Sequence, residues 1–225
     1  MERRFERELE SLKTSLIKMG SVVEENVSAA VRALLDGDEA LAQQVIAADQ
    51  RVNSLELEID NTVIDLLALQ QPVASDLRFI IAAQKINNDL ERIGDHAVNI
   101  AEGVSTLKPL KGKGVMLEVP RMCEIALEML KNAIDGFITL DADLAHKVLG
   151  RDDLIDELNR KMTNEVIDQL RGANSSIECG LELIRVSRNL ERVGDLATNI
   201  AEEVIFHTQA RVVKHHADEL RERSD

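Results

Sequence analysis

The feature that most constrains the fold of this chain is an internal repeat. The segment NDLERIGDHAVNIAEGV at residues 88–104 matches RNLERVGDLATNIAEEV at residues 188–204 at eleven of seventeen positions. Upstream, Asp49 aligns with Asp152 at a spacing of 103 residues. Self-similarity at a nearly fixed spacing is typical of a structural unit that is used twice. The sequence therefore predicts two similar halves, and we expect them to pack side by side about an approximate two-fold axis.

Each half has the pattern of three helices. Apolar residues recur every three or four positions through long segments that are broken only at short turn signals. Asp38 and Asp141 each stand just before such a segment and are expected as N-caps or first-turn acids. Short turns between long helices force sequential neighbours to lie antiparallel. The predicted helices span residues 3–36, 39–70, 74–107, 115–139, 141–171 and 176–220.

These helices predict an all-α fold of six long helices in two tandem three-helix bundles. The first bundle is expected within residues 1–109 and the second within residues 110–225, with a linker of Lys, Pro and Gly residues at 108–114 between them. The chain has no Trp or Tyr and 44% hydrophobic residues, which favours packed helices over sheet.

Charge and composition exclude several classes of function. The net charge of −14 and the lack of aromatic platforms argue against nucleic-acid binding. The longest apolar run, at residues 79–83, is far too short to span a bilayer, and the charged start does not resemble a signal peptide. Cys123 and Cys179 are isolated, so we expect buried thiols rather than a disulfide or a zinc site. The prediction is a cytoplasmic protein without direct membrane insertion.

The repeated segment carries an acidic stripe. At 100° per residue, the four side chains of its first copy lie within about 80° of one another, opposite the apolar face. Gly94 and Gly194 flank that apolar face, where the lack of a Cβ atom would let another helix approach closely. The stripe comprises Glu91, Asp95, Asn99 and Glu102 in the first half, and Glu191, Asp195, Asn199 and Glu202 in the second.

Paired carboxylates at this spacing are suitable ligands for a hard metal ion. Acidic and amide side chains with the same spacing recur on the preceding long helix of each half and could form a second wall of the site. These candidates are Asp49 and Asn53 in the first half, and Asp152 and Asp156 in the second. We expect iron, Mn or Mg before Ca or Zn, and binding that weakens as the pH falls toward about 4, where free carboxylates titrate.

A solvated helix face is the ordinary interpretation of one such acidic pair, with Arg92 and Arg192 bridging to nearby acids. The duplication favours a binding role, because unconstrained surface positions should diverge faster than the core. His96 has Leu196 as its counterpart, so no function shared by both halves can require this histidine. We expect it at a helix surface or boundary.

The two motifs resemble the PhoU family, the accessory regulators of bacterial high-affinity phosphate transport. The resemblance rests on NDLERIGDHAVNIAE, RNLERVGDLATNIAE, the phrase QPVASDLR at residues 71–78 and the two-copy layout. It implies two three-helix bundles whose acidic motifs bind metal, in some members as iron clusters. The implied ligands are Asp89, Glu91 and Asp95 in the first half, and Glu191 and Asp195 in the second. Asn189 stands where the first motif has Asp89, and QPVASDLR has no clear second copy, so the halves are expected to have specialised.

The resemblance also implies a function. Members restrain the phosphate-starvation response by linking the transporter, through its ATPase, to a sensor histidine kinase, and they limit phosphate uptake; a homodimer is plausible for the family. No enzymatic activity is implied, and the sequence offers no nucleophile–base pair or phosphate-binding loop. Two alternatives remain open: a ferritin-like di-metal oxidase, which would need Glu-x-x-His motifs that the sequence lacks, and a purely structural helical scaffold.

Overall fold

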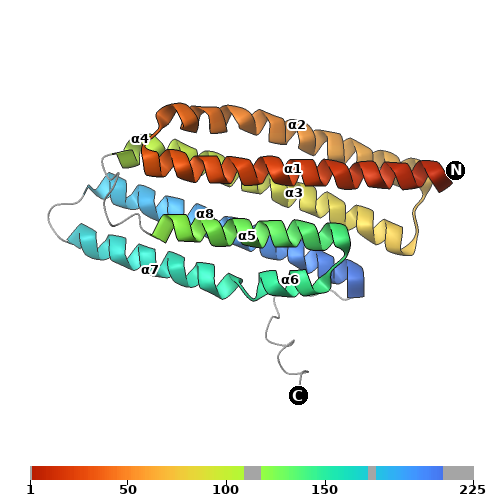
Figure 1. Ribbon diagram of the computed structural model, residues 1–225. Coiled ribbons are helices and arrows are strands. Elements are labelled where there is room, and N and C mark those ends of the chain that lie inside the picture. Colours follow the sequence, from red (N-terminus) through yellow and green to blue (C-terminus); the bar gives the residue numbers. More distant parts are fainter. Residues whose placement is uncertain (1, 109–117, 172–175, 210–225) are drawn as a thin grey trace, which may run out of the picture.

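The computed structural model describes residues 2–108, 118–171 and 176–209, which form helices joined by short turns (Figure 1). No strand occurs within these ranges, so the all-α prediction is confirmed. The helices are α1 (Glu2–Asp36), α2 (Glu39–Gln70), α3 (Ala74–Glu102), α4 (Val104–Leu107), α5 (Glu118–Thr139), α6 (Ala142–Leu149), α7 (Asp152–Arg171) and α8 (Ile177–Gln209).

All six predicted helices are present in this arrangement. The predicted third helix corresponds to α3 and α4, which meet at Gly103, and the predicted fifth corresponds to α6 and α7, which meet at Gly150 and Arg151. Some predicted features lie outside the described residues: the boundary between residues 109 and 110, most of the linker at 108–114, residues 115–117 of the predicted fourth helix and the predicted helical residues after Gln209.

The two predicted caps are confirmed. The side chain of Asp38 accepts hydrogen bonds from the backbone N–H groups of Ala40 and Leu41, both at 3.0 Å. Asp141 likewise accepts from the N–H groups of Asp143 at 2.9 Å and Leu144 at 3.2 Å. Such caps satisfy backbone donors that a helix leaves unpaired at its start. They fix where α2 and α6 begin, and therefore which residues of each helix face the core.

The helices form two bundles that share one core. The first bundle contains α1, α2 and α3, and the second contains α5, α7 and α8 with the short α6 (Figure 1). The two bundles meet where α3 packs on α8 and α1 packs on α5. Buried apolar side chains from every one of these helices form a single cluster. None of the described helices is long and apolar enough to span a membrane.

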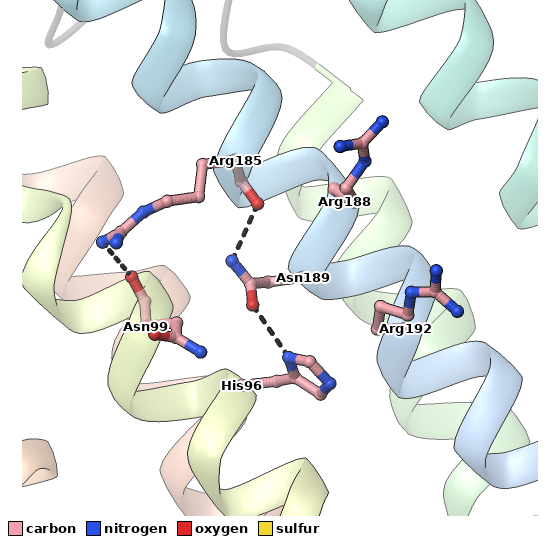
Figure 2. Close-up of a pocket in the computed structure, with 6 residues that line it drawn as sticks. All are labelled: His96, Asn99, Arg185, Arg188, Asn189 and Arg192. Atoms are coloured by element: carbon pink, nitrogen blue, oxygen red, sulfur yellow. Dashed lines mark hydrogen bonds between the residues drawn. The ribbon is translucent and has the colours of Figure 1, made fainter.

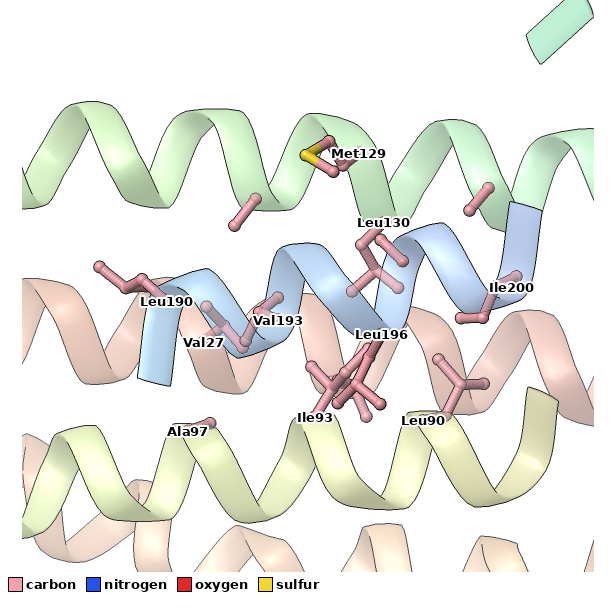
Figure 3. Packing of buried hydrophobic residues seen from close by; sticks show 14 of the residues in the cluster. Val27, Leu90, Ile93, Ala97, Met129, Leu130, Leu190, Val193, Leu196 and Ile200 are labelled. Carbon is pink, nitrogen blue, oxygen red and sulfur yellow. The ribbon is translucent and has the colours of Figure 1, made fainter. Parts of the chain in front are cut away.

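Helices α3 and α8 run antiparallel through the centre of the molecule (Figure 3). Leu90 and Ile93 of α3 lie opposite the apolar side chains of α8, including Leu196, which is 2% exposed. Polar contacts at the edges of this pair are exchanged between the halves: Lys85 pairs with Glu203, and its counterpart Arg185 pairs with Glu102. The two pairs are related only approximately by the repeat, because the residue aligned with Glu203 is Gly103, next to Glu102.

The repeated glycines lie where neighbouring helices approach each other closely. A Cβ atom on Gly94 would stand 3.2 Å from Val52 and 3.3 Å from the Oδ1 atom of Asp49, both on α2. A Cβ atom on Gly194 would stand 3.1 Å from Ile155 on α7. The missing side chains let α3 approach α2, and α8 approach α7, at the level of the acidic motifs, as the sequence predicted.

Candidate metal centres

The first acidic cluster forms where α2 faces α3. Asp49 of α2 lies beside Gly94 of α3, which directly precedes Asp95 of the stripe. Asn53 donates a hydrogen bond to the Oδ2 atom of Asp49 at 3.0 Å. The other oxygen of Asp49, Oδ1, is buried and has no hydrogen-bond partner among the described residues. A buried carboxylate oxygen without a donor is unfavourable unless a proton or a cation binds it.

The electrostatics show that this cluster is a set of mutually repelling carboxylates. Burial raises the pKa of Asp49, and the charge of Asp95 raises it further. Burial also raises the pKa of Glu91, with additional contributions from Asp95, Glu56 and Asp49. The structure therefore brings Glu91 and Asp95 of α3 together with the predicted second wall on α2.

Glu56 is a member of this cluster that the sequence argument missed. Burial raises the pKa of its side chain, and the charges of Asp60 and Asp95 raise it further. Glu56 lies two helical turns after Asp49 on the same face of α2, and this spacing could have identified it. At the spacing of 103 residues its counterpart is Asn159, which accepts a hydrogen bond from Ser187 at 2.6 Å instead. Each cluster therefore has four carboxylates, but they differ in placement: Glu56 has Asn159 as its counterpart, and Asn53 has Asp156.

The second cluster forms at the matching place between α7 and α8. Burial raises the pKa of Asp152 to about 6, and the charges of Asp156, Asp195, Asp153 and Glu191 raise it as well. Its Oδ1 atom is again buried without a partner among the described residues, as in the aligned Asp49. The same carboxylate oxygen is therefore buried and unpaired at the aligned position of both halves.

Two further observations describe the exposed side of this second cluster. Burial raises the pKa of Asp156, and the charge of Asp195 raises it further. Asp195 also accepts a hydrogen bond from Arg192 at 2.9 Å, which is the bridge expected of a solvated helix face. The prediction that the stripes face outward is confirmed, because none of the eight stripe side chains is buried.

Not every predicted site residue joins these clusters. Asp89 interacts with Asn199 and Glu203 of α8 and with Arg92, between the two bundles, so its assignment to the first ligand set is not supported by its position. The reason is helical geometry, since two residues of an α-helix turn a side chain through about 200°, away from Glu91. Glu102 is exposed and pairs with Arg185 at 3.5 Å rather than with the cluster.

Asn99, Asn199 and Glu202 also turn toward the contact between α3 and α8. Among the described residues, no group of three or more His, Cys, Asp or Glu side chains is arranged so that it could hold a metal ion. A bound ion would therefore require new rotamers of the outward-facing carboxylates, with water completing its shell. The donor set nevertheless fits a hard cation, because every side-chain donor in it is an oxygen atom and two of these oxygens are buried and unpaired.

The α3–α8 contact contains two open grooves that are related by the repeat. The first, which we term the carboxylate groove, has a volume of about 490 Å³. Burial raises the pKa of Asp89 in it to about 6, against the opposing effect of Arg92. The second, which we term the arginine groove, has a volume of about 290 Å³. The carboxylate groove is lined by Lys85, Asn88, Asp89, Arg92, Asn199, Glu202 and Glu203, and the arginine groove by His96, Asn99, Arg185, Arg188, Asn189 and Arg192.

His96 and the two cysteines, to which the sequence assigned no role shared by both halves, lie at a helix boundary and in the core. His96 is partly buried at the boundary of α3, where its Nδ1 atom is 2.8 Å from Oδ1 of Asn189. Cys123 and Cys179 are free and buried, as predicted.

Two helical repeats with aligned carboxylate clusters define a class of duplicated helical-bundle proteins. The PhoU domain family matches this chain twice, at residues 16–104 and 119–204, and the chain belongs to this family. Phosphate-specific transport system accessory protein PhoU homologues are similar over most of their lengths. One from Clostridium acetobutylicum is 36% identical over 90% of this chain and 93% of its own, and one from Thermotoga maritima is 39% identical over 90% and 88%.

Solved structures show the same fold. The crystal structure of PhoU from Pseudomonas aeruginosa superposes with a TM-score of 0.88 at 38% identity, covering 92% of this chain and all of that one. The phosphate transport system regulatory protein PhoU from Streptococcus pneumoniae gives a TM-score of 0.87 at 31% identity, covering 93% and 99%. The resemblance inferred from the two motifs is therefore confirmed.

Proposed function

We propose that this protein is a metal-binding regulator of phosphate homeostasis. In this role it would link a phosphate ABC transporter, through the transporter's ATPase, to a phosphate-sensing histidine kinase, and so restrain both phosphate uptake and the starvation response. Membership of the PhoU family supports a place in a phosphate transport system. The observation that carries the metal-binding part is the pair of aligned, orphaned oxygens of Asp49 and Asp152.

The metal would be held by the two clusters separately. In the first half, Asp49, Glu91 and Asp95 are the proposed ligands, with Glu56 at the margin. In the second half, the ligands are Asp152, Asp156, Glu191 and Asp195. An all-oxygen set favours iron, Mn or Mg. A cation would relieve the repulsion that raises the pKa of Asp49, Glu91 and Asp152, and it would give the buried oxygens a partner.

The regulatory role requires binding to proteins rather than chemistry on a substrate. We propose that the protein acts in the cytoplasm as a homodimer without enzymatic activity, and that membrane association occurs through its transporter partner. A pull-down from phosphate-replete cells should recover the transporter ATPase and the kinase. Recovery of neither partner would contradict the proposed link.

A di-metal oxidase is the less favoured function. That chemistry needs carboxylates and Glu-x-x-His motifs that project into a bundle core. The sequence has no Glu-x-x-His, and the acidic stripes face outward. Oxidation of added ferrous iron faster than in buffer would favour the oxidase over the regulator.

Metal content measured by elemental analysis tests the binding site directly. We expect Glu91→Gln with Asp95→Asn to lose the metal of the first cluster only, and Glu191→Gln with Asp195→Asn to lose that of the second only. Removal of two anionic ligands should weaken binding by at least roughly 100-fold, since even loss of an outer-shell partner costs about 10- to 100-fold.

The matched control neutralises two acids with the same spacing outside both clusters. Glu6 and Glu10 are exposed on α1 and are also four residues apart. The variant Glu6→Gln with Glu10→Gln should therefore keep its full metal content. If both cluster variants also keep their metal, the acids serve as a solvated face and the scaffold interpretation replaces the metal site.

A further inference from the structure

The arginine groove is a concentration of positive charge on an acidic protein (Figure 2). Three arginines of α8 line it at intervals of about one helical turn, and no carboxylate is among its lining residues. The whole chain carries a net charge of −14, so this groove departs strongly from the average surface. A local basic concavity on an acidic surface attracts anions to one place.

A fixed hydrogen-bond chain forms the floor of this groove. Asn189 is 9% exposed, and its Nδ2 group donates to the backbone oxygen of Arg185 at 2.8 Å. Its Oδ1 atom therefore faces His96, whose Nδ1 group donates to it at 2.8 Å (Figure 2). Both ends of the buried amide are occupied. The floor is thus held in place without using the guanidinium groups around it.

The arginines retain free donors. Arg188 forms no ion pair within the described part of the chain, and its side chain extends from α8 away from His96 (Figure 2). Arg192 uses one terminal nitrogen, at 2.9 Å from Asp195. Each guanidinium has five N–H groups, so most donors of Arg192 and all those of Arg188 remain available.

Arg185 is more fully engaged than the other two arginines. It contacts Glu182 at 2.9 Å, the backbone oxygen of Asn99 at 2.9 Å and Glu102 at 3.5 Å. These contacts tie α8 to α3 along one side of the groove, and the two carboxylates offset the charge of Arg185. Arg188 consequently supplies the charge that no carboxylate offsets.

We infer that the arginine groove binds a small phosphate-type oxyanion, either free phosphate or the phosphate group of a small ester. Guanidinium groups present paired N–H donors that match the oxygens of a tetrahedral anion. The volume of about 290 Å³ lies at the lower end of ligand sites, which suits a small anion better than a nucleotide. The choice of phosphate among such anions rests on the proposed function, whereas the anionic character of the ligand rests on the groove.

The carboxylate groove explains why we expect one such site per chain. Asp89 stands there at the position of Asn189, and Glu202 and Glu203 line the same space. Their negative charges would repel an oxyanion despite Lys85 and Arg92. The repeat thus presents two grooves of similar origin, of which only one has the charge that the ligand needs.

Calorimetric titration of the full-length protein with inorganic phosphate tests this inference. The protein is first freed of metal by a chelator, so that a bound ion cannot retain the phosphate, and chloride keeps the ionic strength constant. We expect saturable binding of one phosphate per chain with a Kd between about 1 μM and 1 mM. No saturable binding up to about 10 mM phosphate would overturn the inference.

Substitution of the unpaired arginine locates the site. Arg188→Gln should weaken phosphate binding about tenfold, which is the effect of losing about 1.4 kcal/mol of binding free energy. Arg171→Gln is the matched control, because it removes the same charge from α7, where Arg171 is 76% exposed and outside the groove. Equal losses in both variants would indicate general charge attraction and would contradict the assigned site, as would an unchanged affinity in Arg188→Gln.

A second variant keeps the test valid if Arg188→Gln is poorly folded, as judged by circular dichroism. Asn189→Asp places in the arginine groove the residue that the other half carries, and it should lower phosphate affinity at least tenfold. Unchanged affinity in a folded Asn189→Asp protein would overturn the inference. Methyl phosphate, titrated in parallel, distinguishes the two sources: tighter binding of the ester than of inorganic phosphate would identify an ester as the ligand, and the reverse would identify free phosphate.

The proposed function and the anion site can fail separately. The metal test changes carboxylates of the two clusters, while the phosphate test changes Arg188 or Asn189 and uses metal-free protein. Retained metal in the cluster variants would refute the metal centres alone. Absent phosphate binding would refute the arginine groove alone.

Discussion

The two grooves between α3 and α8 began as copies of one another and now differ in charge. Asp89 and Glu203 of the carboxylate groove correspond to Asn189 and Gly103 in the other half of the repeat. The acidic clusters of the two halves, by contrast, keep Glu91, Asp95 and their counterparts unchanged. The contact between the halves has thus changed in charge, while the α3 and α8 carboxylates of the clusters have not. This difference is what the proposed roles predict, with a metal site common to both halves and an anion site in one groove only.

The largest effect on stability is expected at Asp89, where the grooves differ by a single carboxylate. Its side chain is 13% exposed, and its pKa is about 6 in the folded protein against about 3.9 in an unfolded chain. The folded state therefore binds this proton more tightly. The contribution of Asp89 to the free energy of unfolding should be highest below pH 4 and should fall as the pH rises from about 4 to about 6.

Asp89→Asn should remove this loss of stability with rising pH, because it places in the first half the asparagine that the second half has at Asn189. We expect the variant to be more stable than the natural protein by about 1 to 3 kcal/mol at pH 8 and nearly equal to it at pH 4, by urea unfolding. Asp168→Asn, at an exposed position on α7, is the control and should show little change. A less stable Asp89→Asn protein at pH 8 would show that Lys85 and Arg92 more than offset the burial of this carboxylate.

The metal clusters give a pH prediction of intermediate size. The pKa of Asp152 is raised to about 6, so a proton competes with metal at a higher pH than for a free carboxylate. The sequence alone placed this loss near pH 4, because burial cannot be inferred from acidic spacing. Below pH 6 we expect the metal affinity of the second cluster to fall about tenfold per pH unit, measured by competition with a chelator. An affinity that is constant between pH 6 and pH 5 would exclude Asp152 as a ligand.

The repeat allowed much of the fold to be predicted from the sequence. Helical periodicity, the caps Asp38 and Asp141, and the aligned motifs were sufficient for two bundles and for the approach of α2 to Gly94. The breaks that separate α3 from α4 and α6 from α7 were not predicted, because Gly103 and Gly150 carry no stronger local signal than other glycines.

The site was predictable only in part. Spacing along one helix correctly grouped Glu91 with Asp95, and the alignment of the halves added Asp49 and Asp152. Neither the spacing nor the alignment could distinguish side chains that point to the same broad face of α3 but contact different neighbouring helices. Asn99 and Glu102 turned out to lie beside α8 because the interbundle packing, which no single-helix pattern encodes, determines what each edge of α3 meets. The arginine groove was not predicted for the same reason, since it is formed by residues of both α3 and α8 and depends on how these helices pack.

The smallest effect is expected at Glu102, and it distinguishes a groove residue from a cluster residue. Glu102 and Arg185 are 50% and 43% exposed and 3.5 Å apart, and solvent-exposed pairs of this kind contribute roughly 0 to 1 kcal/mol. Glu102→Gln should therefore change the free energy of unfolding by less than about 0.5 kcal/mol and should leave the metal content unchanged, by urea unfolding and elemental analysis. The aligned residue of Arg185 is Lys85, whose partner Glu203 is only 13% exposed. Lys85→Met should therefore lower the free energy of unfolding more than Glu102→Gln, because it leaves the largely buried carboxylate of Glu203 unpaired. Loss of metal from Glu102→Gln would return this residue to the ligand set, and would mean that the acidic stripe acts as one unit along the whole of α3.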